Sequence, residues 1–358
     1  MSYPKIFYDN IIYNLQNAGG VSAYWYQLCK RILNYNVVYF GGNNNNLFSK
    51  NLNINFQKES VLPISLLRYL PFTKYLCKNS VFHSSYYRFS FQKYVSNITT
   101  VHDFTYEYFY SGLNKQIHTC QKNFAILNSA GIICVSQNTK KDLIKFLPSV
   151  NHSRIKVIYN GVGDEFFPVN NFDSYSGFDE LIGLKFVLFV GDRSPYKNFT
   201  KAVEVVKEIK NLHLVIVGGK TLSDSELVNL SVLKGRFHSY IGVDVKRLNL
   251  LYNRAFCLLY PSSYEGFGIP VVEAMKAGCP VVSTNLSSIP EVAGDAALLV
   301  DNPDTDSLLE KVNLLFNPVI RENLRIKGFK QASKFSWDRC FEETMTFYHE
   351  VWSRERNG

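Results

Sequence analysis

Two glutamates stand at the ends of a glycine-rich loop in the stretch YPSSYEGFGIPVVEAM, residues 260–275. Seven residues separate Glu265 from Glu273, and they begin with Gly266, Phe267, Gly268, Ile269 and Pro270. Glycines let backbone N–H groups approach a ligand, and proline suits the first turn of a helix. We therefore expect a loop that opens into a helix, with two carboxylates and several amides available to a polar ligand. Compensation of the helix dipole would explain Glu273 in the first turn, but it would not explain Glu265 in the preceding loop.

A second loop with closely spaced charges is GDRSPYKN, residues 191–198, which follows an apolar run. Arg193 and Lys197 stand four residues apart in it. Arginine binds phosphate as a fork and lysine as a point charge, so the two side chains can hold the phosphates of one ligand. Two solvated loop cations explain the pattern equally well, and Asp192 has to point away from any bound anion.

Paired glycines follow the first apolar run, in QNAGGVS at residues 16–22. Gly19 and Gly20 precede an apparent helix at 23–33, and the N-terminus of a helix favours anions. An ordinary strand-to-helix turn explains these glycines as well. The spacing is not GxGxxG, so the fingerprint of a dinucleotide-binding site is absent.

Several polar side chains of the N-terminal half follow predicted strands. His102 can donate a hydrogen bond to a substrate hydroxyl or act as an acid or base. A single histidine is more often a structural residue, and His83 carries the same alternative. Position alone adds candidates for contacts to a second substrate, which are Asp9, His83, Tyr86, Asp103 and Tyr106.

These side chains need a scaffold, and short apolar runs that alternate with helical patterns predict one. The runs lie at residues 5–9, 37–41, 81–83, 99–103, 132–136 and 155–159, and then at 186–191, 212–217, 256–260, 280–283 and 297–300. Such alternation indicates parallel sheets covered by helices on both faces. Two series predict an α/β protein with two Rossmann-like domains whose strand ends face an inter-domain cleft.

A turn-rich stretch at residues 160–184 has no clear period and marks the domain boundary. We expect the first domain at 1–165 and the second at 166–340. An amphipathic tail helix, assigned to 341–358 with a pattern that starts near Trp337, is expected to cross back to the first domain.

The composition is that of an ordinary globular protein, with 46% hydrophobic and 19% charged residues among 358. The start of the chain lacks a basic segment followed by an apolar core, and the apolar runs have only strand length. We therefore expect neither a secretory signal nor a membrane span. Seven cysteines without a CxxC pair indicate reduced thiols and a cytoplasmic protein.

The net charge of +9 is concentrated in one half of the chain. Residues 1–165 hold 17 Lys and Arg against 7 Asp and Glu, whereas the rest holds 22 against 23. A basic half is typical of proteins that bind nucleic acid, anionic lipid or phosphates. No nucleic-acid-binding motif accompanies it, so we expect no nucleic-acid partner. The basic aromatic run 66–94 is either a half-buried helix face or a surface for the membrane.

A DxD sequence at Asp304-Thr305-Asp306 resembles a metal clamp. It follows Asn302-Pro303 and precedes an apolar helical pattern, which indicates helix capping instead. We expect no metal site and no cofactor.

The glutamate motif resembles the E-x7-E signature of the retaining glycosyltransferases of family 4, which have the GT-B fold. The resemblance continues through AMKAGCPVV at 274–282 and SSIPEV at 287–292. Looser landmarks appear in order at 19–22, 101–103, 135–136, 157–161 and 191–198, so the resemblance covers nearly the whole chain.

The resemblance implies a role for each matching residue. Arg193 and Lys197 would hold the diphosphate of a nucleotide sugar, Glu273 the ribose, and Glu265 with the loop amides the transferred sugar. Gly19 or Gly20 would approach the distal phosphate, and His102 would lie beside the sugar. The base would dock near Tyr240-Ile241-Gly242-Val243. The first domain would bind the acceptor and the second the donor.

The resemblance implies transfer of a hexose, with retained configuration, from a nucleotide-diphosphate sugar to a lipid-linked saccharide in polysaccharide or O-antigen assembly. The segments 83–88, 102–104 and 196–198 are most similar to the mannosyltransferase-like branch, which favours GDP-mannose as donor. Work at the inner face of a membrane would suit the basic first domain. The alternatives are a sugar-nucleotide epimerase or phosphorylase on the same fold, and a non-catalytic membrane- or nucleic-acid-binding module.

Overall fold

The computed structural model describes residues 3–42, 44–169 and 177–357. The chain forms two compact units, with residues 1–161 and 337–358 in unit 1 and residues 162–336 in unit 2. Each unit contains one six-stranded sheet in which the paired strands are parallel. The prediction of two Rossmann-like α/β domains is confirmed. The sequence had placed the boundaries a few residues later, after residues 165 and 340.

The sheet of unit 1 has the strand order β2-β1-β3-β4-β5-β6. Its strands are β1 Lys5–Asp9, β2 Val37–Phe40, β3 Ser80–Ser84, β4 Val95–Val101, β5 Gly131–Cys134 and β6 Ile155–Val157. All five residues of β3 are buried, as expected of a strand covered on both faces. The helices of this part of the chain are α1 Ile12–Leu15, α2 Gly20–Arg31, α3 Ile64–Leu67, α4 Thr105–Phe109, α5 Gly112–Leu127 and α6 Gln137–Phe146.

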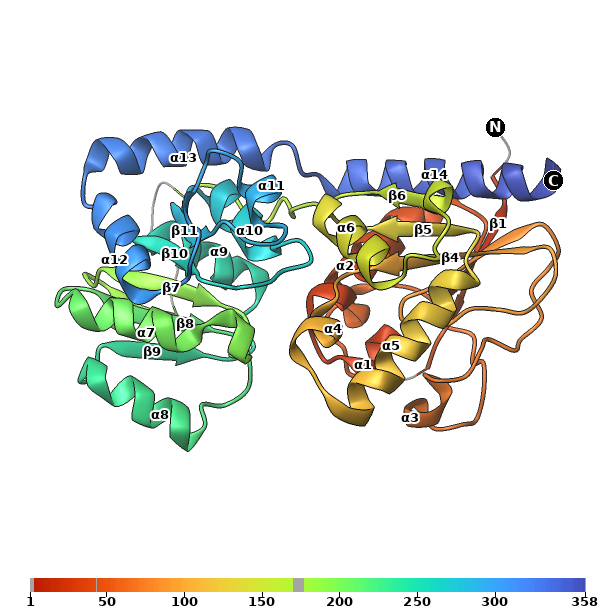
Figure 1. The fold of residues 1–358 in the computed structure, drawn as a ribbon, viewed down its shortest axis with the longest axis horizontal. Helices are drawn as coiled ribbons and strands as arrows, with labels where there is room; N and C mark the ends of the chain where they lie inside the picture. The colour runs from red at the N-terminus through yellow and green to blue at the C-terminus, as the bar shows by residue number, and fades with distance from the viewer. Residues whose placement is uncertain (1–2, 43, 170–176, 358) are drawn as a thin grey trace. The chain divides into compact units, whose positions relative to one another are not determined.

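The tail helix α14, Trp337–Asn357, belongs to unit 1, as the sequence predicted. Figure 1 shows it lying along this unit beside β5 and β6. Its apolar side chains Trp337, Phe341 and Tyr348 join the core formed by β1 and α2. The hydroxyl of Tyr348 lies 3.2 Å from that of Tyr8, which ties the tail to β1.

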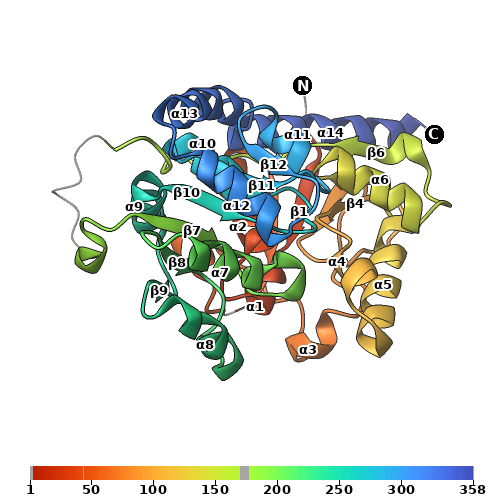
Figure 2. The same ribbon diagram turned by 60° about the vertical axis from the view of Figure 1, so that its left-hand side comes forward.

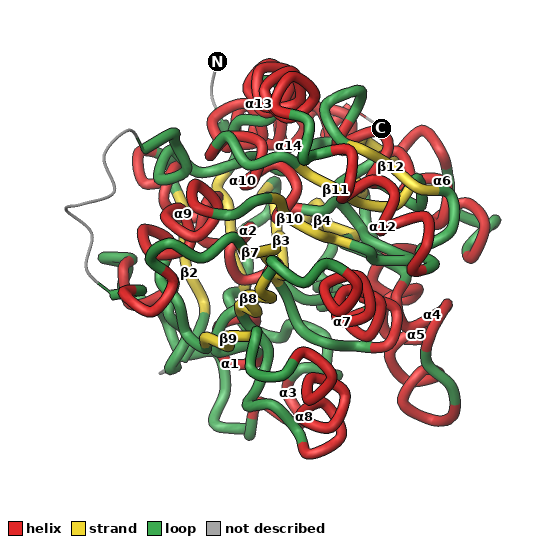
Figure 3. Tube along the Cα trace, turned by 90° about the vertical axis from the view of Figure 1, so that its left-hand side faces the viewer, coloured by secondary structure: helices red, strands yellow, loops and turns green. Residues whose placement is uncertain are grey.

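The sheet of unit 2 has the order β12-β11-β10-β7-β8-β9. Its strands are β7 Phe186–Val190, β8 His213–Val217, β9 Phe237–Tyr240, β10 Cys257–Tyr260, β11 Val281–Thr284 and β12 Leu298–Val300. Its helices are α7 Phe199–Glu208, α8 Asp224–Leu230, α9 Val245–Arg254, α10 Ile269–Ala277, α11 Ile289–Ala293, α12 Thr305–Leu314 and α13 Pro318–Ala332. Helices α7 and α12 cover one face of this sheet, and α9 and α10 cover the other (Figures 2 and 3).

Two sequence-based expectations about elements fail. Strand β9 was not predicted, because Phe237-His-Ser-Tyr240 is a short edge strand with mixed polarity and half-buried side chains. The reading of residues 66–94 as a half-buried helix face is wrong. Helix α3 ends at Leu67, and Asn79 (φ 58°), Tyr87 (φ 32°) and Tyr94 (φ 64°) adopt backbone conformations that a helix does not contain.

The topology brings particular loops together. In unit 2 the neighbouring strands β7, β10 and β11 run parallel, so the loops that follow them leave the same edge of the sheet. In unit 1 the same holds for the loops after β1, β2, β3 and β4. Ligands of open α/β sheets bind at such edges. Gly19, Lys197 and Glu265 lie in these loops, whereas His83 lies within β3 and Glu273 lies on α10.

Candidate functional site

The loops after β7 and β10 are tied to each other by hydrogen bonds. Asn198 caps α7 in the left-handed conformation (φ 53°), which asparagine tolerates better than most residues. Its side-chain amide donates to the backbone oxygen of Pro261 at 2.8 Å and to Ser263 Oγ at 2.7 Å. The backbone N–H of Ser263 donates to the oxygen of Tyr196 at 2.8 Å. These contacts fix the residue before Asn198 opposite the loop that carries Glu265.

That residue is Lys197, and it forms an enclosed ion pair with Glu265. Lys197 Nζ lies 2.5 Å from Glu265 Oε1 and 3.3 Å from the hydroxyl of Tyr260. The two charged side chains are only 11% and 12% exposed. Burial alone would lower the pKa of Lys197, but the negative charge of Glu265 outweighs it and the pKa is raised. The site therefore contains an ammonium group that stays charged at neutral pH.

Two serines in the loop after β11 hold the loop that carries Glu265. The Glu265 N–H donates to Ser287 Oγ at 2.8 Å, and Ser288 Oγ donates to the backbone oxygens of Glu265 and Phe267 at 2.9 and 3.0 Å. Gly268 caps α10 at a φ of 99°, and a Cβ there would lie 2.8 Å from Ile289 Cδ1. Conformation and space both require glycine at this point.

Glu273 lies farther along α10 than the sequence suggested. The helix begins at Ile269 and has no acidic residue in its first turn, so Glu273 falls in the second turn and the dipole explanation is wrong. Its carboxylate accepts a hydrogen bond of 3.0 Å from the hydroxyl of Tyr252 on α9. Burial raises the pKa of Glu273 to about 7, with a further contribution from the charge of Glu165 and an opposing one from Tyr252. Its charge therefore changes near neutral pH.

Arg193 does not have the free guanidinium that the sequence led us to expect. Its Nε donates to Glu226 Oε1 at 2.5 Å, Nη1 to the oxygen of Gly218 at 3.1 Å, and Nη2 to the oxygens of Lys220 and Thr221 at 2.6 and 3.4 Å. A guanidinium has five N–H groups, so these four bonds leave one. That Arg193 and Lys197 hold one diphosphate together stays a prediction. Arg193 holds the loop after β8, and Lys197 is the cation beside Glu265.

The turn after β9 contains the residues expected near the nucleotide base. Gly242 has a φ of 68° and is exposed, with no atom within 4 Å of where a Cβ would stand. Val243 follows it and is half-buried, and Asp244 caps α9 by accepting from the N–H of Arg247 at 2.9 Å. A contact from Gly242 and Val243 to a base stays a prediction.

The paired glycines of unit 1 lie at the start of α2. The helix begins at Gly20 rather than at Ala23, and Gly19 is its N-cap. A Cβ on Gly19 would lie 2.7 Å from Gln16 Oε1, whereas Gly20 has open space at its Cβ position. The close approach at Gly19 comes from this chain, and binding of a phosphate at Gly19 or Gly20 stays a prediction.

His102 directly follows β4 and is half-buried. Its ring meets that of Tyr24 edge to face, with 5.0 Å between the centroids. Burial lowers the pKa of His102 to about 4, although the charge of Asp103 acts in the opposite direction. His102 is therefore neutral at neutral pH. Asp103 Oδ1 accepts from the N–H of Thr105 at 2.9 Å, which holds the loop between β4 and α4.

The prediction that His83 contacts a second substrate is wrong. The side chain is 0% exposed. Its Nδ1 lies 2.5 Å from the hydroxyl of Tyr348, and its Nε2 lies 3.0 Å from Thr100 Oγ1. Burial lowers its pKa to about 3. His83 thus joins the tail helix to the sheet as a neutral structural residue.

The two candidate tyrosines of unit 1 lie in one half-buried aromatic group. The hydroxyl of Tyr86 accepts from Arg68 Nη2 at 2.8 Å. Tyr106 stacks on His118 with 3.8 Å between the centroids, and the ring of Tyr86 lies 6.2 Å from that of His118. Contacts from Tyr86 and Tyr106 to an acceptor stay predictions.

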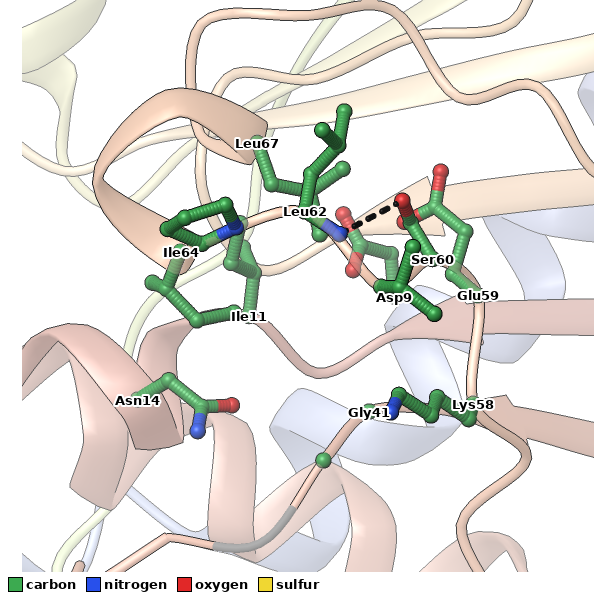
Figure 4. Close-up of a pocket in the computed structure, with 13 residues that line it drawn as sticks. Asp9, Ile11, Asn14, Gly41, Lys58, Glu59, Ser60, Leu62, Ile64 and Leu67 are labelled. Carbon is green, nitrogen blue, oxygen red and sulfur yellow. Dashed lines mark hydrogen bonds between the residues drawn. The ribbon is translucent and has the colours of Figure 1, made fainter.

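Asp9, the last residue of β1, lies in a buried charge cluster. Arg88 Nη1 donates to its Oδ2 at 3.0 Å, and Ser84 Oγ donates to the same oxygen at 2.8 Å. Arg88 also forms a bidentate pair with Glu59 at 2.8 Å. Burial raises the pKa of Asp9, against the opposing charge of Arg88. Asp9 and Glu59 line a cavity of about 240 Å³ (Figure 4).

Asp304 of the DxD sequence is a helix cap, as predicted. It is the N-cap of α12, and its Oδ1 accepts from the N–H of Ser307 at 2.8 Å. Among the residues that the structure describes, no group of three or more His, Cys, Asp or Glu side chains is arranged to hold a metal ion.

Comparison with known families assigns both halves of the chain. Residues 18–166 match the family described as Glycosyltransferase Family 4, and residues 179–331 match that described as Glycosyl transferases group 1. The chain belongs to the glycosyltransferases that combine these two domains in the GT-B fold.

Individual relatives include mannosyltransferases of O-antigen synthesis. The O-antigen chain mannosyltransferase B of Escherichia coli is 34% identical over 173 residues, which cover 46% of this chain and 45% of that protein. The O-antigen chain mannosyltransferase RfbU of Salmonella typhimurium is 33% identical over 196 residues, which cover 52% of each chain. The chain spans 45% to 64% of the length of four curated relatives.

Solved structures share the fold at low sequence identity. Sucrose-phosphate synthase from Thermosynechococcus elongatus superimposes with a TM-score of 0.74 at 17% identity, covering 98% of this chain and 99% of that one. HepE from Anabaena, solved with UDP and glucose, gives a TM-score of 0.73 at 13% identity, covering 96% and 98%. These similarities establish the GT-B fold.

Several residues that build the site escaped the sequence reading. Tyr260 and Tyr252 contact Lys197 and Glu273 through their hydroxyls, but each stands in an apolar run whose pattern suggests core packing. Glu226, the partner of Arg193, sits in a capping box with Ser223, a spacing that could have been recognised. The pairing of Arg88 with Glu59 leaves no local signal in the sequence.

Proposed function

We propose that the protein transfers a hexose, with retained configuration, from a nucleotide-diphosphate sugar to a lipid-linked saccharide in polysaccharide or O-antigen assembly. GDP-mannose is the proposed donor, and no metal takes part. The observation that carries the proposal is the enclosed Lys197–Glu265 pair at the carboxyl ends of β7 and β10. The O-antigen mannosyltransferases among the relatives support the choice of sugar and acceptor.

The reaction breaks the bond between the anomeric carbon and the diphosphate and forms a bond from that carbon to an acceptor oxygen. Negative charge develops on the departing phosphate, and a fixed cation in a site shielded from water lowers the barrier. Lys197 would supply that cation, and Glu265 would accept hydrogen bonds from the transferred sugar. The proton of the acceptor hydroxyl would pass to the departing phosphate on the same face.

The second glutamate is suited to a different part of the donor. Glu273 keeps one hydrogen bond, from Tyr252, and the remaining acceptor positions of its carboxylate are suited to the ribose hydroxyls. Its raised pKa makes this contact depend on pH near neutrality.

An anionic membrane surface is the proposed place of work, at the inner face of the membrane in the cytoplasm. Three largely exposed aromatic side chains, Tyr75, Phe91 and Tyr94, lie within three residues of Lys74, Lys78 or Lys93 in the sequence. The segments meet, because the Asn79 N–H donates to the oxygen of Tyr94 at 2.8 Å and Lys78 lies 5.3 Å from the Tyr94 ring. Aromatic rings with lysines suit an anionic lipid interface. No helix among the described residues is long and apolar enough to span a bilayer.

The decisive experiment is mass spectrometry of products after incubation with GDP-mannose, UDP-glucose and other nucleotide sugars, with and without a lipid-linked acceptor. We expect hexose on the lipid-linked acceptor from GDP-mannose, formed in the presence of a chelator. Free epimerised sugar in the absence of acceptor would indicate the epimerase instead. Failure to bind or consume any nucleotide sugar would refute the proposal.

A further inference from the structure

A cavity of about 480 Å³ lies in unit 2, at the amino ends of three neighbouring strands. Its lining includes Lys185, Phe256 and Pro280, which directly precede β7, β10 and β11. The Lys197–Glu265 pair follows β7 and β10, so it lies at the opposite edge of the same sheet. The volume falls within the roughly 300–1,000 Å³ of small-molecule pockets, and the proposed transfer reaction uses none of the residues that line it.

Two packed aromatic rings form part of the lining, and two cations lie over them. The ring centroids of Phe256 and Phe316 are 4.8 Å apart. Lys185 Nζ lies 5.4 Å from the first centroid and 5.0 Å from the second. The guanidinium carbon of Arg321 lies 5.3 Å from the centroid of Phe256. Contacts of this kind hold the two charges in place, so that a ligand need not order them when it binds.

The charged side chains of the lining leave a positive surplus. Among the described residues, the side chains of Lys185 and Arg321 have no hydrogen bond or ion pair. The other two charged residues, Arg325 and Glu322, neutralise each other through two hydrogen bonds of 2.8 and 2.6 Å. Three cations and one carboxylate thus give the lining a net charge of +2. A phosphate monoester, with a charge of about −1.5 to −2 at pH 7, matches this surplus better than a carboxylate does.

The cavity also offers an apolar surface to the organic part of such a ligand. Phe316 is 43% exposed, and Pro280 and Pro318 line the same cavity. A bare phosphate ion would leave this surface in water, whereas a ring joined to the phosphate would cover it. The lining therefore favours a phosphate that carries a ring over phosphate alone.

We infer that this cavity binds a small phosphate monoester with a ring, whose phosphate contacts Lys185 and Arg321 and whose ring lies against Phe316. The site is separate from that of the donor, and the inference does not depend on the proposed transfer reaction. A nucleotide sugar and the phosphate ester can therefore be bound at the same time.

The test is calorimetry of the full-length protein with phenyl phosphate, mannose 6-phosphate, methyl phosphate and inorganic phosphate. The two esters that carry a ring are expected to bind at least about threefold more tightly than the other two probes. The tighter of these two esters then shows whether the preferred ring is aromatic or a sugar.

Two neutral substitutions remove the unpaired charges one at a time. Arg321→Gln and Lys185→Gln are each expected to weaken the binding of phenyl phosphate about tenfold. Neither substitution takes a partner from a described carboxylate, so the thermal midpoint should change little. Arg339→Gln, at an exposed arginine of unit 1, is the control and should leave this binding unchanged. Lys197→Ala should also leave it unchanged, because the donor site is a different one.

A third substitution should act in the opposite direction. Glu322→Gln releases Arg325 from its partner and adds one positive charge to the lining, so phenyl phosphate should bind about two- to threefold more tightly. The matched control is Glu310→Gln, whose carboxylate is 66% exposed and pairs with Lys311 outside the cavity, and it should have no effect. An unchanged or weaker affinity in Glu322→Gln would contradict the assignment of the phosphate to this cluster.

Three other outcomes would overturn the inference. None of the four probes binds, or neither Arg321→Gln nor Lys185→Gln weakens phenyl phosphate, or Lys197→Ala abolishes its binding because the donor site holds the phosphate. Equal affinity for all four probes would refute a ligand with a ring. Binding of GDP-mannose is measured on the same samples and bears on the transferase proposal alone, so the failure of one proposal can be told from the failure of the other.

Discussion

Replacing Lys197 by alanine removes the only cation whose ammonium contacts Glu265 among the described residues, and two effects should follow. Loss of a donor that stabilises developing charge lowers turnover roughly 10²–10³-fold. Loss of one partner of a buried ion pair costs about 3–5 kcal/mol of folding free energy. We take about 3 kcal/mol, because both side chains keep about a tenth of their surface in solvent. At about 2–4 °C per kcal/mol for a domain of this size, the thermal midpoint falls by roughly 6–12 °C.

The two effects can be separated with a second substitution. In Lys197→Ala/Glu265→Gln the carboxylate that lost its partner becomes a neutral amide, so most of the lost stability should return. Turnover should stay low, because the ammonium of Lys197 no longer faces the departing phosphate. Turnover is measured as nucleotide release at saturating donor, and stability as the thermal midpoint by scanning fluorimetry.

The control is a lysine–glutamate pair of the same unit that is exposed. Lys201 and Glu204 on α7 lie 2.8 Å apart with side chains 39% and 38% exposed. Lys201→Ala should therefore cost less than about 1 kcal/mol and leave turnover unchanged. The reasoning is refuted if Lys197→Ala turns over donor at a near-normal rate. It is equally refuted if the double variant regains turnover together with stability, because the lysine would then only balance the charge of Glu265.

Three further predictions concern single residues. Donor affinity should rise between about pH 6 and pH 8, because Glu273 has a pKa of about 7 and ionises in this range. Calorimetry should show that donor affinity depends less on pH in Glu273→Gln, whereas Glu208→Gln should behave like the unmodified protein. An equal pH dependence in Glu273→Gln and the unmodified protein would show that Glu273 does not bind the donor. His83 has a pKa of about 3 in the folded protein against about 6.5 in the unfolded chain. Between these values the unfolded chain binds more protons, so the free energy of unfolding falls as the pH drops. Urea titrations of His83→Gln should show a smaller fall of this free energy with pH, and an unchanged fall would contradict the buried neutral state of His83. Gly268→Ala should lower stability by about 1–3 kcal/mol, since the new Cβ meets Ile289 at 2.8 Å and φ is 99°; an unaltered thermal midpoint would show that the loop relaxes.

Most of the sheet architecture could be predicted, because buried parallel strands are written as continuous apolar runs. The prediction for residues 5–9 coincides with β1, and Phe186–Val190 forms β7 with every residue buried. Strand β9 could not be predicted in this way, since an edge strand buries only part of each side chain and tolerates His238 and Ser239. An apolar run in the sequence therefore indicates that a segment is buried, and it predicts a strand only where that strand is buried.

Only those charged residues of the site that lie in recognisable loops could be predicted from the sequence. Lys197 and Glu265 were found, and their pairing agrees with the parallel neighbours β7 and β10. The partner of His83 is Tyr348, which lies 265 residues away on the tail helix. The sequence around a polar residue cannot show whether that residue already has hydrogen-bond partners elsewhere in the protein. The hydrogen-bond partners of Arg193 and the burial of His83 were missed for that reason.

The seven residues between the two glutamates separate two electrostatic environments. Glu265 lies in a loop held by the serines that follow β11, where it meets the ammonium of Lys197. Glu273 lies in the second turn of α10, where it meets the hydroxyl of Tyr252 and burial raises its pKa to about 7. The carboxylate of Glu265 is therefore paired with a cation, whereas the charge of Glu273 changes with pH near neutrality. If both served one donor molecule, Glu273→Gln would change the pH dependence of donor binding, whereas Glu265→Gln would lower the donor affinity itself by removing the charge that faces Lys197.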